Sequence, residues 1–424
     1  MQGLLQARAY PHEVGDVELI ETHISTVLLA GKFAYKIKKP VNLGFLDFSS
    51  LPLRRHYCEE ELRINRRLAP RVYLDVVSIL GSADAPRIGP HDAPEAIEYA
   101  VKMQRFEQSA LLDRMLGSGE LTPQHLDALA ASVAAFHSGI GRSVAGGAAD
   151  AGYGTPASIE APMLQNFEQI RPLLDNDEER AALARLEEWS RAAHAELSPL
   201  MEERRRAGYV RECHGDLHLG NITWIDGEIQ VFDCIEFNPA LRWIDVASEI
   251  AFTVMDLAAR GKPAWGARFL NATLEITGDY AVLRLFKYYL VYRAMVRAKV
   301  ARIRAAQTGA ELREAGLHRT VLADYAEHIK LATSYTLPGQ AALIITRGVS
   351  GSGKTTATQP LVEQLGAVRL RSDVDRKRLH RLPREARSHA ALNAELYAPS
   401  ASLATYAELR RLADDMVKTM NAER

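Results

Sequence analysis

The sequence has little cysteine, almost no net charge and no long apolar run. Only three cysteines, Cys58, Cys213 and Cys234, occur in 424 residues, and none forms a CxxC pair. This excludes a disulfide framework and a cysteine zinc site, and favours a reducing, cytoplasmic setting with each cysteine as a small buried apolar residue. Residues 1–10 lack the basic region and apolar core of a signal peptide. No apolar stretch approaches membrane-spanning length.

The charge balance gives no sign of a large charged partner. The formal net charge is -1, and the 47% hydrophobic and 25% charged residues are ordinary for globular proteins. We therefore expect neither nucleic acid nor a membrane as partner, while the oligomeric state stays unknown. A length of 424 residues exceeds one typical core and predicts about two or three domains.

A polar cluster stands out in the middle of the chain. It consists of His214-Gly215-Asp216-Leu217-His218-Leu219-Gly220-Asn221, with Asp233 shortly after it. An aspartate that accepts a hydroxyl proton, with an asparagine and a second aspartate to hold magnesium, is what phosphoryl transfer from ATP requires. The order, with Asp216 ahead of Asn221, is also that of kinases. The alternative is a structural turn whose polar side chains cap the backbone.

Apolar residues between 222 and 232 predict two short strands joined by a turn at Asp226-Gly227. Such a hairpin would place Asp216, Asn221 and Asp233 around one small space. The sequence thus predicts a magnesium and phosphate site built on a single hairpin.

The first hundred residues predict a sheet with one helix. Strands are expected at 17–22, 26–30, 33–38, 72–80 and 97–103, a loop at 81–94, and a helix at 53–68. Lys36 and Lys38 share one face of their strand, and either one is a candidate for the lysine that contacts ATP phosphates; we choose Lys36. Of three consecutive glutamates we choose Glu61 as its partner, because it shares a helix face with Leu68, and expect the other two to be solvated. Met103 begins the strap where adenine would meet the backbone.

The following residues predict helices, among them 164–201, 245–257 and 283–303. We expect His137 to make a structural contact and Asp245 to have a structural role, such as capping its helix. The basic residues of the last helix could meet an acidic substrate, but a solvated face is favoured; they are Arg293, Arg297, Lys299 and Arg302.

The C-terminal region carries a complete Walker A pattern. A linker at 331–340 and an apolar strand at 342–346 precede Gly348-Val349-Ser350-Gly351-Ser352-Gly353-Lys354-Thr355, and Thr356 follows. The backbone of Gly348, Gly351 and Gly353 would turn toward phosphate, Lys354 would supply charge, and the Thr355 hydroxyl would ligate magnesium. A second strand at 368–371 would place Asp373 as a base toward a second substrate. Because no further apolar strand ending in aspartate follows, we expect a truncated module that does not turn over nucleotide alone.

These motifs resemble known families. Residues 1 to about 330 resemble the aminoglycoside phosphotransferase and choline kinase group, which has the two-lobed protein-kinase-like fold; residues 341–424 resemble the first half of a zeta-toxin or polynucleotide-kinase-like P-loop kinase. The order resembles bifunctional phosphotransferase and ATP-binding proteins. The resemblance implies Asp216 as the catalytic base, Asn221 and Asp233 as magnesium ligands, and Lys36 as the phosphate-binding residue; we add His214 as a catalytic candidate. One departure is the loop at 23–25, which has no glycine over the phosphates.

We therefore predict an α+β two-lobed protein-kinase-like domain followed by a truncated α/β P-loop NTPase module. The lobes are expected at 1–103 and 104–330, and the module at 341–424. The predicted function is ATP- and magnesium-dependent phosphorylation of a small-molecule hydroxyl. The alternatives are a nucleotide-binding sensor without turnover, and kinase activity in the C-terminal module.

Overall fold

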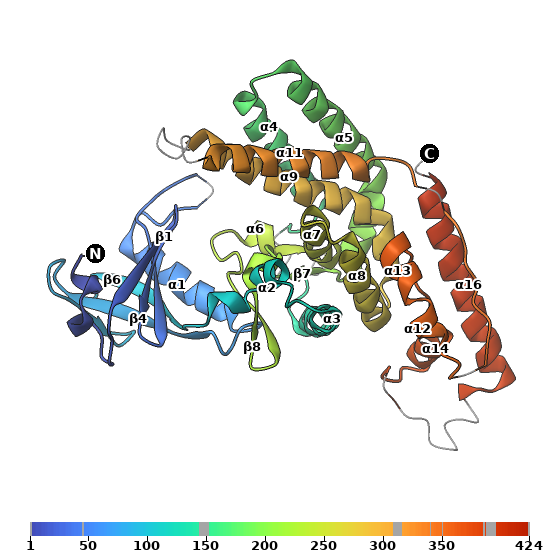
Figure 1. Cartoon of the computed structure of the whole chain (residues 1–424), viewed down its shortest axis with the longest axis horizontal. Coiled ribbons are helices and arrows are strands. Elements are labelled where there is room, and N and C mark those ends of the chain that lie inside the picture. Colours follow the sequence, from blue (N-terminus) through green and yellow to red (C-terminus); the bar gives the residue numbers. More distant parts are fainter. Residues whose placement is uncertain are drawn as a thin grey trace. The chain divides into compact units, whose positions relative to one another are not determined.

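The computed structural model of the protein describes residues 2–44, 46–143, 152–307, 316–339, 341–349, 351–384, 386 and 396–422. The chain divides into two units, Met1–Thr122 with Arg211–Ile244, and Pro123–Val210 with Asp245–Arg424 (Figure 1). The stretch from His214 to Asp233 thus belongs to the first unit, and the predicted boundaries at 103, 330 and 341 stay predictions. Within the described ranges, no helix is both long and apolar enough to cross a membrane.

The first unit is built on a six-stranded antiparallel sheet with the strand order β1-β2-β3-β6-β4-β5. Its strands are β1 (Val17–Glu21), β2 (Ser25–Ala30), β3 (Phe33–Lys38), β4 (Tyr73–Gly81), β5 (Pro86–Gly89) and β6 (Glu98–Gln104). The predicted strands are confirmed to within two residues. Strand β5 corrects the expectation of an uninterrupted loop at 81–94.

Successive side chains of strand β3 point to opposite faces of the sheet, one apolar and one charged. Tyr35 and Ile37 pack into an apolar cluster with the N-terminal turns η1 (Gln2–Leu5) and η2 (Ala7–Ala9). Lys36 and Lys38 point to the other face, where helix α1 (Leu51–Asn65) packs against β4 and β6.

Helix α1 begins at a defined cap. The Ser50 side chain accepts the N–H of Leu53, and Pro52 lies in the first turn. Helix α1 ends at Asn65, three residues before the end of the range predicted to be helical, so Leu68 lies beyond it.

The stretch from His214 to Asp233 and its surroundings are built from short elements. They are η3 (Gln108–Ala110), α2 (Leu112–Ser118), β7 (Val210–Glu212), η5 (Leu219–Asn221), β8 (Ile222–Ile225), β9 (Glu228–Val231), α6 (Pro239–Arg242) and β10 (Trp243–Asp245). Strands β8 and β9 pair as the predicted hairpin. Its turn residues Asp226 and Gly227 have φ values of 50° and 82°, as the tight turn of a hairpin demands. The predicted hairpin and its turn are confirmed.

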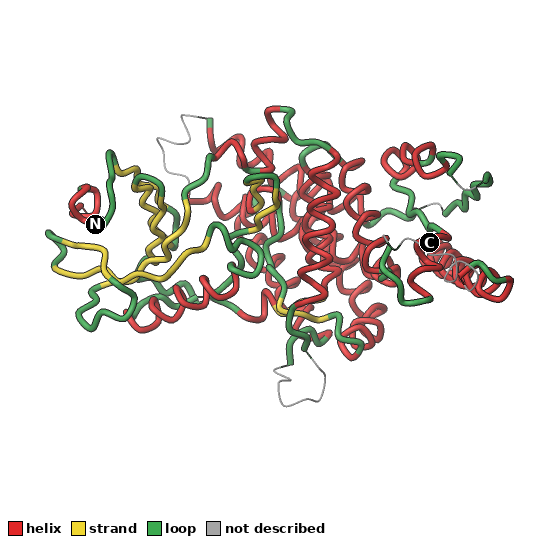
Figure 2. Tube along the Cα trace, turned by 90° about the horizontal axis from the view of Figure 1, so that it is seen from below, coloured by secondary structure: helices red, strands yellow, loops and turns green. Residues whose placement is uncertain are grey.

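The second unit is helical where it precedes the C-terminal module (Figure 2). Its helices are α3 (Pro123–Gly139), α4 (Pro156–Ile170), α5 (Asp177–Arg206), α7 (Val246–Ala259), α8 (Pro263–Thr277), α9 (Leu283–Gln307) and α11 (Leu317–Tyr335), with turns η4 (Arg171–Leu173) and η6 (Tyr280–Val282). The helix predicted at 164–201 is in fact two, because the chain breaks after Ile170 and restarts at the Asn176 cap. The structural role of Asp245 is confirmed: it caps α7 and pairs with Arg204.

The C-terminal module consists of helices α12 (Lys354–Ala357), α13 (Gln359–Leu365), α14 (Ser372–Leu379) and α16 (Pro399–Ala422). The strands predicted at 342–346 and 368–371 do not form in the described residues. The apolar run Leu343, Ile344 and Ile345 is instead 62%, 53% and 82% exposed. A strand needs a neighbour for its backbone groups, and the apolar pattern alone does not supply one.

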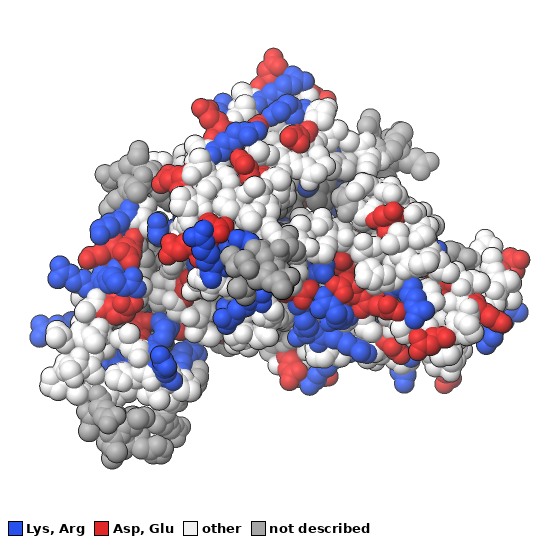
Figure 3. Space-filling model, turned by 180° about the vertical axis from the view of Figure 1, so that it is seen from behind, with Lys and Arg blue, Asp and Glu red and all other residues white. Residues whose placement is uncertain are grey.

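Charged side chains of both signs are scattered over the face shown in Figure 3. Lysine and arginine are interspersed with aspartate and glutamate there, in keeping with the net charge of -1. The visible face offers no broad area of one sign of the kind that draws nucleic acid.

Candidate active site

A lysine in β3 lies between two carboxylates that are remote in sequence. Lys36 Nζ donates to Glu61 Oε1 at 2.9 Å and to Asp233 Oδ1 at 2.6 Å. The Lys36 side chain is 14% exposed and Glu61 is fully buried, whereas Asp233 is 48% exposed. The lysine is therefore anchored from the interior by Glu61 and paired with a carboxylate that solvent reaches.

The charges of this cluster stabilise one another. Burial lowers the pKa of Lys36, but the charges of Asp233 and Glu61 outweigh it and hold that pKa well above its ordinary value. For Glu61, burial raises the pKa, while the charges and hydrogen bonds of Lys36 and Lys38 lower it to about 2. Both groups are therefore charged at neutral pH.

The structure distinguishes Lys36 from Lys38, which the sequence left as alternatives. The Lys38 side chain is fully buried, and its Nζ donates to Glu61 Oε2 at 2.7 Å and to Glu236 Oε1. Lys36 is thus the more accessible of the two and the one that pairs with Asp233.

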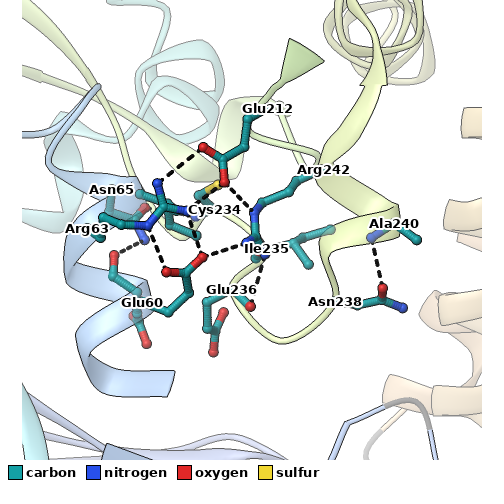
Figure 4. Close-up of polar contacts among 12 residues, drawn as sticks. Glu60, Arg63, Asn65, Glu212, Cys234, Ile235, Glu236, Asn238, Ala240 and Arg242 are labelled. Carbon is teal, nitrogen blue, oxygen red and sulfur yellow. Dashed lines mark hydrogen bonds and ion pairs between the residues drawn. The ribbon is translucent and has the colours of Figure 1, made fainter. Parts of the chain in front are cut away.

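The three glutamates of α1 also separate. Glu61 pairs with the lysines, and Glu59 is 40% exposed as expected. The expectation that a second glutamate would be solvated is wrong for Glu60. Its side chain is 16% exposed and pairs with Arg63 and Arg242, because this helix face lies against the catalytic segment (Figure 4).

Asp216 and Asn221 are bonded to each other. Asn221 Nδ2 donates to Asp216 Oδ2 and to the Asp216 carbonyl, both at 3.0 Å. His218 Nε2 lies 3.4 Å from the same Oδ2, and the Asp216 side chain is 34% exposed. Gly215 has a φ of 88°, and a Cβ there would lie 2.7 Å from the Leu241 carbonyl oxygen. This turn therefore requires glycine, and it presents an oriented, accessible carboxylate.

His214 is buried, and its ring bonds to backbone on both sides. Nε2 lies 2.9 Å from the Phe232 carbonyl oxygen, and Nδ1 accepts the N–H of Asp216 at 3.3 Å. Since Nδ1 is an acceptor, Nε2 carries the proton and donates it to Phe232. The imidazole joins the start of the catalytic stretch to the strand that leads to Asp233.

Asp233 adopts a left-handed backbone conformation, with a φ of 63°. Its N–H donates to the Tyr73 hydroxyl at 3.2 Å, and the preceding Phe232 N–H donates to the Asn221 carbonyl at 2.9 Å. Such a conformation is unfavourable for a non-glycine residue and persists where surrounding bonds enforce it. The hydrogen bond between the Phe232 N–H and the Asn221 carbonyl therefore links the backbone of Asn221 to the residue before Asp233.

The donor set fits magnesium. The Asn221 NH2 group faces Asp216, which leaves its Oδ1 to act as a ligand atom. Asp233 offers a carboxylate with only one oxygen bonded to Lys36. A carbonyl oxygen and a carboxylate are ligands that this hard cation accepts.

Met103 lies in strand β6 of the sheet, before the connection in which adenine was expected to meet the backbone. It pairs with Ala34 at the end of β6. The backbone returns at Arg105, whose N–H donates to Lys32. The ring of Phe106 then lies 5.4 Å from that of Phe232, next to Asp233.

The Walker A segment lies in the second unit, and its lysine bonds to the backbone of the same loop. Gly351 and Gly353 have φ values of 77° and 78°, a region that glycine permits. Lys354 Nζ donates to the carbonyl oxygens of Gly348 and Val349 at 2.7 and 2.6 Å. The Lys354 ammonium group is therefore hydrogen-bonded within its own loop.

The threonines that follow, Thr355 and Thr356, are exposed. Ser350 of the motif lies outside the described residues. Arg369 Nη1 donates to the Thr355 carbonyl at 3.2 Å, and Arg369 Nε donates to Glu275 of α8 at 3.0 Å. The loop is thus connected to a buried glutamate of α8.

The candidate substrate residue Asp373 lies in the first turn of α14. It pairs with Lys377 at 3.0 Å and accepts from the Tyr397 hydroxyl at 3.3 Å. Its position at the end of a strand, as expected from the sequence, is wrong because that strand does not form in the described residues.

The basic residues of α9 correct another expectation. Arg293 and Arg302 are buried and do not form a solvated face. Arg293 Nε donates to Ser248, and Arg302 to Leu173 and Asp175, so both act as tertiary contacts. The expected structural contact of His137 is confirmed by its bond to Glu249.

Sequence reasoning missed the residues that support the site from behind. The sequence presents Lys38 only as an alternative to Lys36, and it gives no sign of a role for Glu236, Asn65 or Arg242. Charged or amide residues inside buried apolar surroundings were the available signal, but their partners are distant in sequence.

Comparison with known proteins identifies the family of the chain. Residues 48–286, more than half of the chain, match the phosphotransferase enzyme family, and residues 343–421 match an AAA domain. An uncharacterized protein of Mycobacterium tuberculosis is 30% identical over 405 residues, which make up 95% of this chain and 77% of that protein. An uncharacterized protein of Mycobacterium bovis matches to the same extent.

Solved structures are more distant. A spectinomycin phosphotransferase in complex with ADP and spectinomycin is 13% identical, with a TM-score of 0.46, covering 79% of this chain and 97% of that chain. An ethanolamine kinase of Plasmodium vivax is 10% identical, with a TM-score of 0.41, covering 76% and 82%. The assignment therefore rests on the sequence matches: the chain belongs to the phosphotransferase enzyme family, with a fold of mixed helix and sheet and a C-terminal P-loop module.

Proposed function

We propose that the first unit transfers the terminal phosphoryl group of ATP, with magnesium, to a hydroxyl of a small molecule. The observation that carries this proposal is Lys36 bonded to both Glu61 and Asp233, in the unit that also presents the accessible carboxylate of Asp216. Both family matches support ATP as the donor. The mixed charges of the face seen in Figure 3 favour a small acceptor over nucleic acid.

Each side chain has a distinct role in this proposal. Lys36 binds phosphate oxygens, and Asp216 draws the proton from the acceptor hydroxyl as its oxygen bonds to phosphorus and the bond to ADP breaks. His214 orients Asp216 through its backbone. Asn221 and Asp233 would hold magnesium, which when bound offsets the negative charge of the phosphoryl oxygens.

The test is a screen of small hydroxyl compounds with purified protein, ATP and magnesium, run beside Asp216→Asn. We expect one class of acceptor to support turnover, and the variant to lose about 10²–10⁴-fold in rate. Turnover of the variant within a few-fold of the unaltered protein would exclude Asp216 as base. Tight ATP binding with no turnover on any acceptor would favour a nucleotide sensor instead.

A second candidate places the chemistry in the C-terminal module, because its Walker A pattern is complete and Asp373 is accessible. The structure favours a point substitution over deletion as the test, since the module is bonded to α8 through Glu275. Lys354→Ala should leave acceptor-dependent turnover within a few-fold of that of the unaltered protein. Loss of this turnover would show that the C-terminal module carries the activity.

A further inference from the structure

A second buried ion pair lies directly behind the first. The side chains of Lys38 and Glu236 are 0% and 5% exposed, and Lys38 Nζ donates to a Glu236 oxygen. The same Nζ lies 4.8 Å from the centre of the Phe48 ring. A buried charge pair costs desolvation that packing alone does not require, so its surroundings indicate what it does.

Lys38 controls the orientation of Glu61. The two oxygens of this carboxylate are divided between the lysines, Oε1 to Lys36 at 2.9 Å and Oε2 to Lys38 at 2.7 Å. Without Lys38, the buried Oε2 would lose its hydrogen-bond donor, and only the bond to Lys36 would be left to orient the carboxylate. The bond that serves the phosphate-binding lysine therefore depends on a second lysine.

Glu236 fixes the segment that carries Asp233. It follows Asp233 by three residues, and the bond to Lys38 ties this segment to β3. Asn65, one turn beyond Glu61 on α1, donates to the Glu61 carbonyl at 2.9 Å and accepts the N–H of Cys234 at 2.8 Å. The segment is thus held by both β3 and α1.

Arg242 adds a third anchor, seen in Figure 4. Its guanidinium donates to the carbonyl oxygens of Ile235 and Glu236 and pairs with Glu60 and Glu212. Three anchors on the residues after Asp233 explain how its left-handed conformation is maintained.

We propose that Lys38 and Glu236 are positioning residues for phosphoryl transfer: the pair holds Glu61 against Lys36 and fixes the segment of Asp233, so that the phosphate-binding and metal-binding groups keep their places before nucleotide arrives. Neither residue touches the reacting atoms. The inference rests on the proposed function, because it assigns phosphate to Lys36 and magnesium to Asp233.

The test measures binding of Mg-ATP to full-length protein by calorimetry, in a Lys354→Ala background that removes the Walker A lysine. Glu236→Gln keeps the shape of the side chain and removes its charge; we expect Mg-ATP affinity to fall about 10–100-fold, as for other groups that orient metal ligands. The matched control is Glu98→Gln, which removes a partly buried ion pair of the same unit with Arg54. This control should leave Mg-ATP affinity unchanged even if it lowers the melting temperature.

A charge exchange separates positioning from a purely structural pair. In K38E/E236K the pair between the two positions persists, but Glu61 Oε2 now faces a carboxylate. We expect affinity to stay at least as low as in Glu236→Gln, whereas a return to the value of the background protein would overturn the inference. If the exchange variant does not melt cooperatively, Glu236→Gln decides alone: affinity equal to that of Glu98→Gln overturns the proposal.

These outcomes differ from failure of the proposed function. A background protein that binds Mg-ATP but phosphorylates no acceptor refutes the transfer reaction and leaves the affinity comparison valid. A background protein that binds no Mg-ATP at all refutes both.

Discussion

Two lysines of this protein are predicted to bind phosphate, and the fold holds them in opposite ways. Lys36 bonds to carboxylates 25 and 197 residues away, in a unit whose sheet and helix are complete. Lys354 bonds to carbonyl oxygens of its own loop, five and six residues away. The strand expected to support that loop does not form in the described residues.

The difference shows what a short motif does and does not specify. The glycines of Walker A fix local backbone geometry, which needs only neighbours in sequence. The setting of Lys36 needs a strand, a helix and a hairpin in register, so it depends on the whole unit. A complete motif therefore predicts phosphate affinity, whereas a cluster held by remote partners predicts a preorganised catalytic site.

The largest effect should come from the lysines themselves. Lys36→Met removes a positive group aimed at the phosphates, and we expect kcat/KM for ATP to fall about 10²–10³-fold. Lys354→Met should change it by no more than about twofold. Steady-state kinetics at varied ATP, with whichever acceptor the screen identifies, measure both. Equal losses of kcat/KM in the two variants would contradict the assignment of ATP binding for transfer to Lys36 and not to Lys354.

The second effect concerns stability. Glu61→Gln leaves two buried lysines with one carboxylate fewer, and we expect the free energy of unfolding to fall by about 3 kcal/mol. Its neighbour Glu59 is 40% exposed, so Glu59→Gln should cost less than about 0.5 kcal/mol. Urea unfolding gives both values. Similar costs for the two variants would contradict the proposed dependence on Glu61.

The same glutamate should give a pH dependence. Its pKa is held at about 2 in the folded protein against an ordinary 4.5, by Lys36 and Lys38 acting against burial. The depressed pKa stabilises the fold above about pH 4.5, and this contribution is lost as the pH falls toward 2. Burial raises the pKa of Glu236 instead, so its contribution has the opposite sign and is lost as the pH rises.

Urea midpoints measured from pH 5 to 2 test this dependence. The acid decline should be shallower in Glu61→Gln than in the unaltered protein. An equally steep decline would show that other carboxylates account for it.

The smallest effect belongs to the C-terminal module. Glu275 is buried on α8 and accepts from Arg369 and Arg371, so Glu275→Gln should weaken the packing of the module by about 1–2 kcal/mol. Hydrogen exchange should then accelerate in α13 and α14 and stay unchanged in the sheet of the first unit. The exposed Glu327 is the matched control, and its change to glutamine should alter neither region. Acceleration throughout the chain would contradict a local role.

Much of the kinase-like site could be predicted from sequence. The β8–β9 hairpin and strand β3 follow from alternation and turn residues, which are local patterns. The pairing of Lys36 with Glu61 was expected from the kinase arrangement of a strand lysine and a helix glutamate, not from local sequence. The roles of Lys38 and Glu236 could not be predicted, since they are 198 residues apart and nothing near either residue indicates the other. The prediction of a strand at 342–346 was wrong because its local pattern is apolar, whereas strand pairing depends on partners elsewhere in the chain.

The most direct measurement is covalent labelling with an acyl-phosphate derivative of ATP, which acylates a lysine beside the bound phosphates, followed by peptide mass spectrometry. Lys36 should be acylated, excess ATP should suppress the reaction, and the fully buried Lys38 two residues away should remain unmodified. Acylation of Lys354 with none at Lys36 would contradict the assignment of the phosphoryl-transfer site to the first unit.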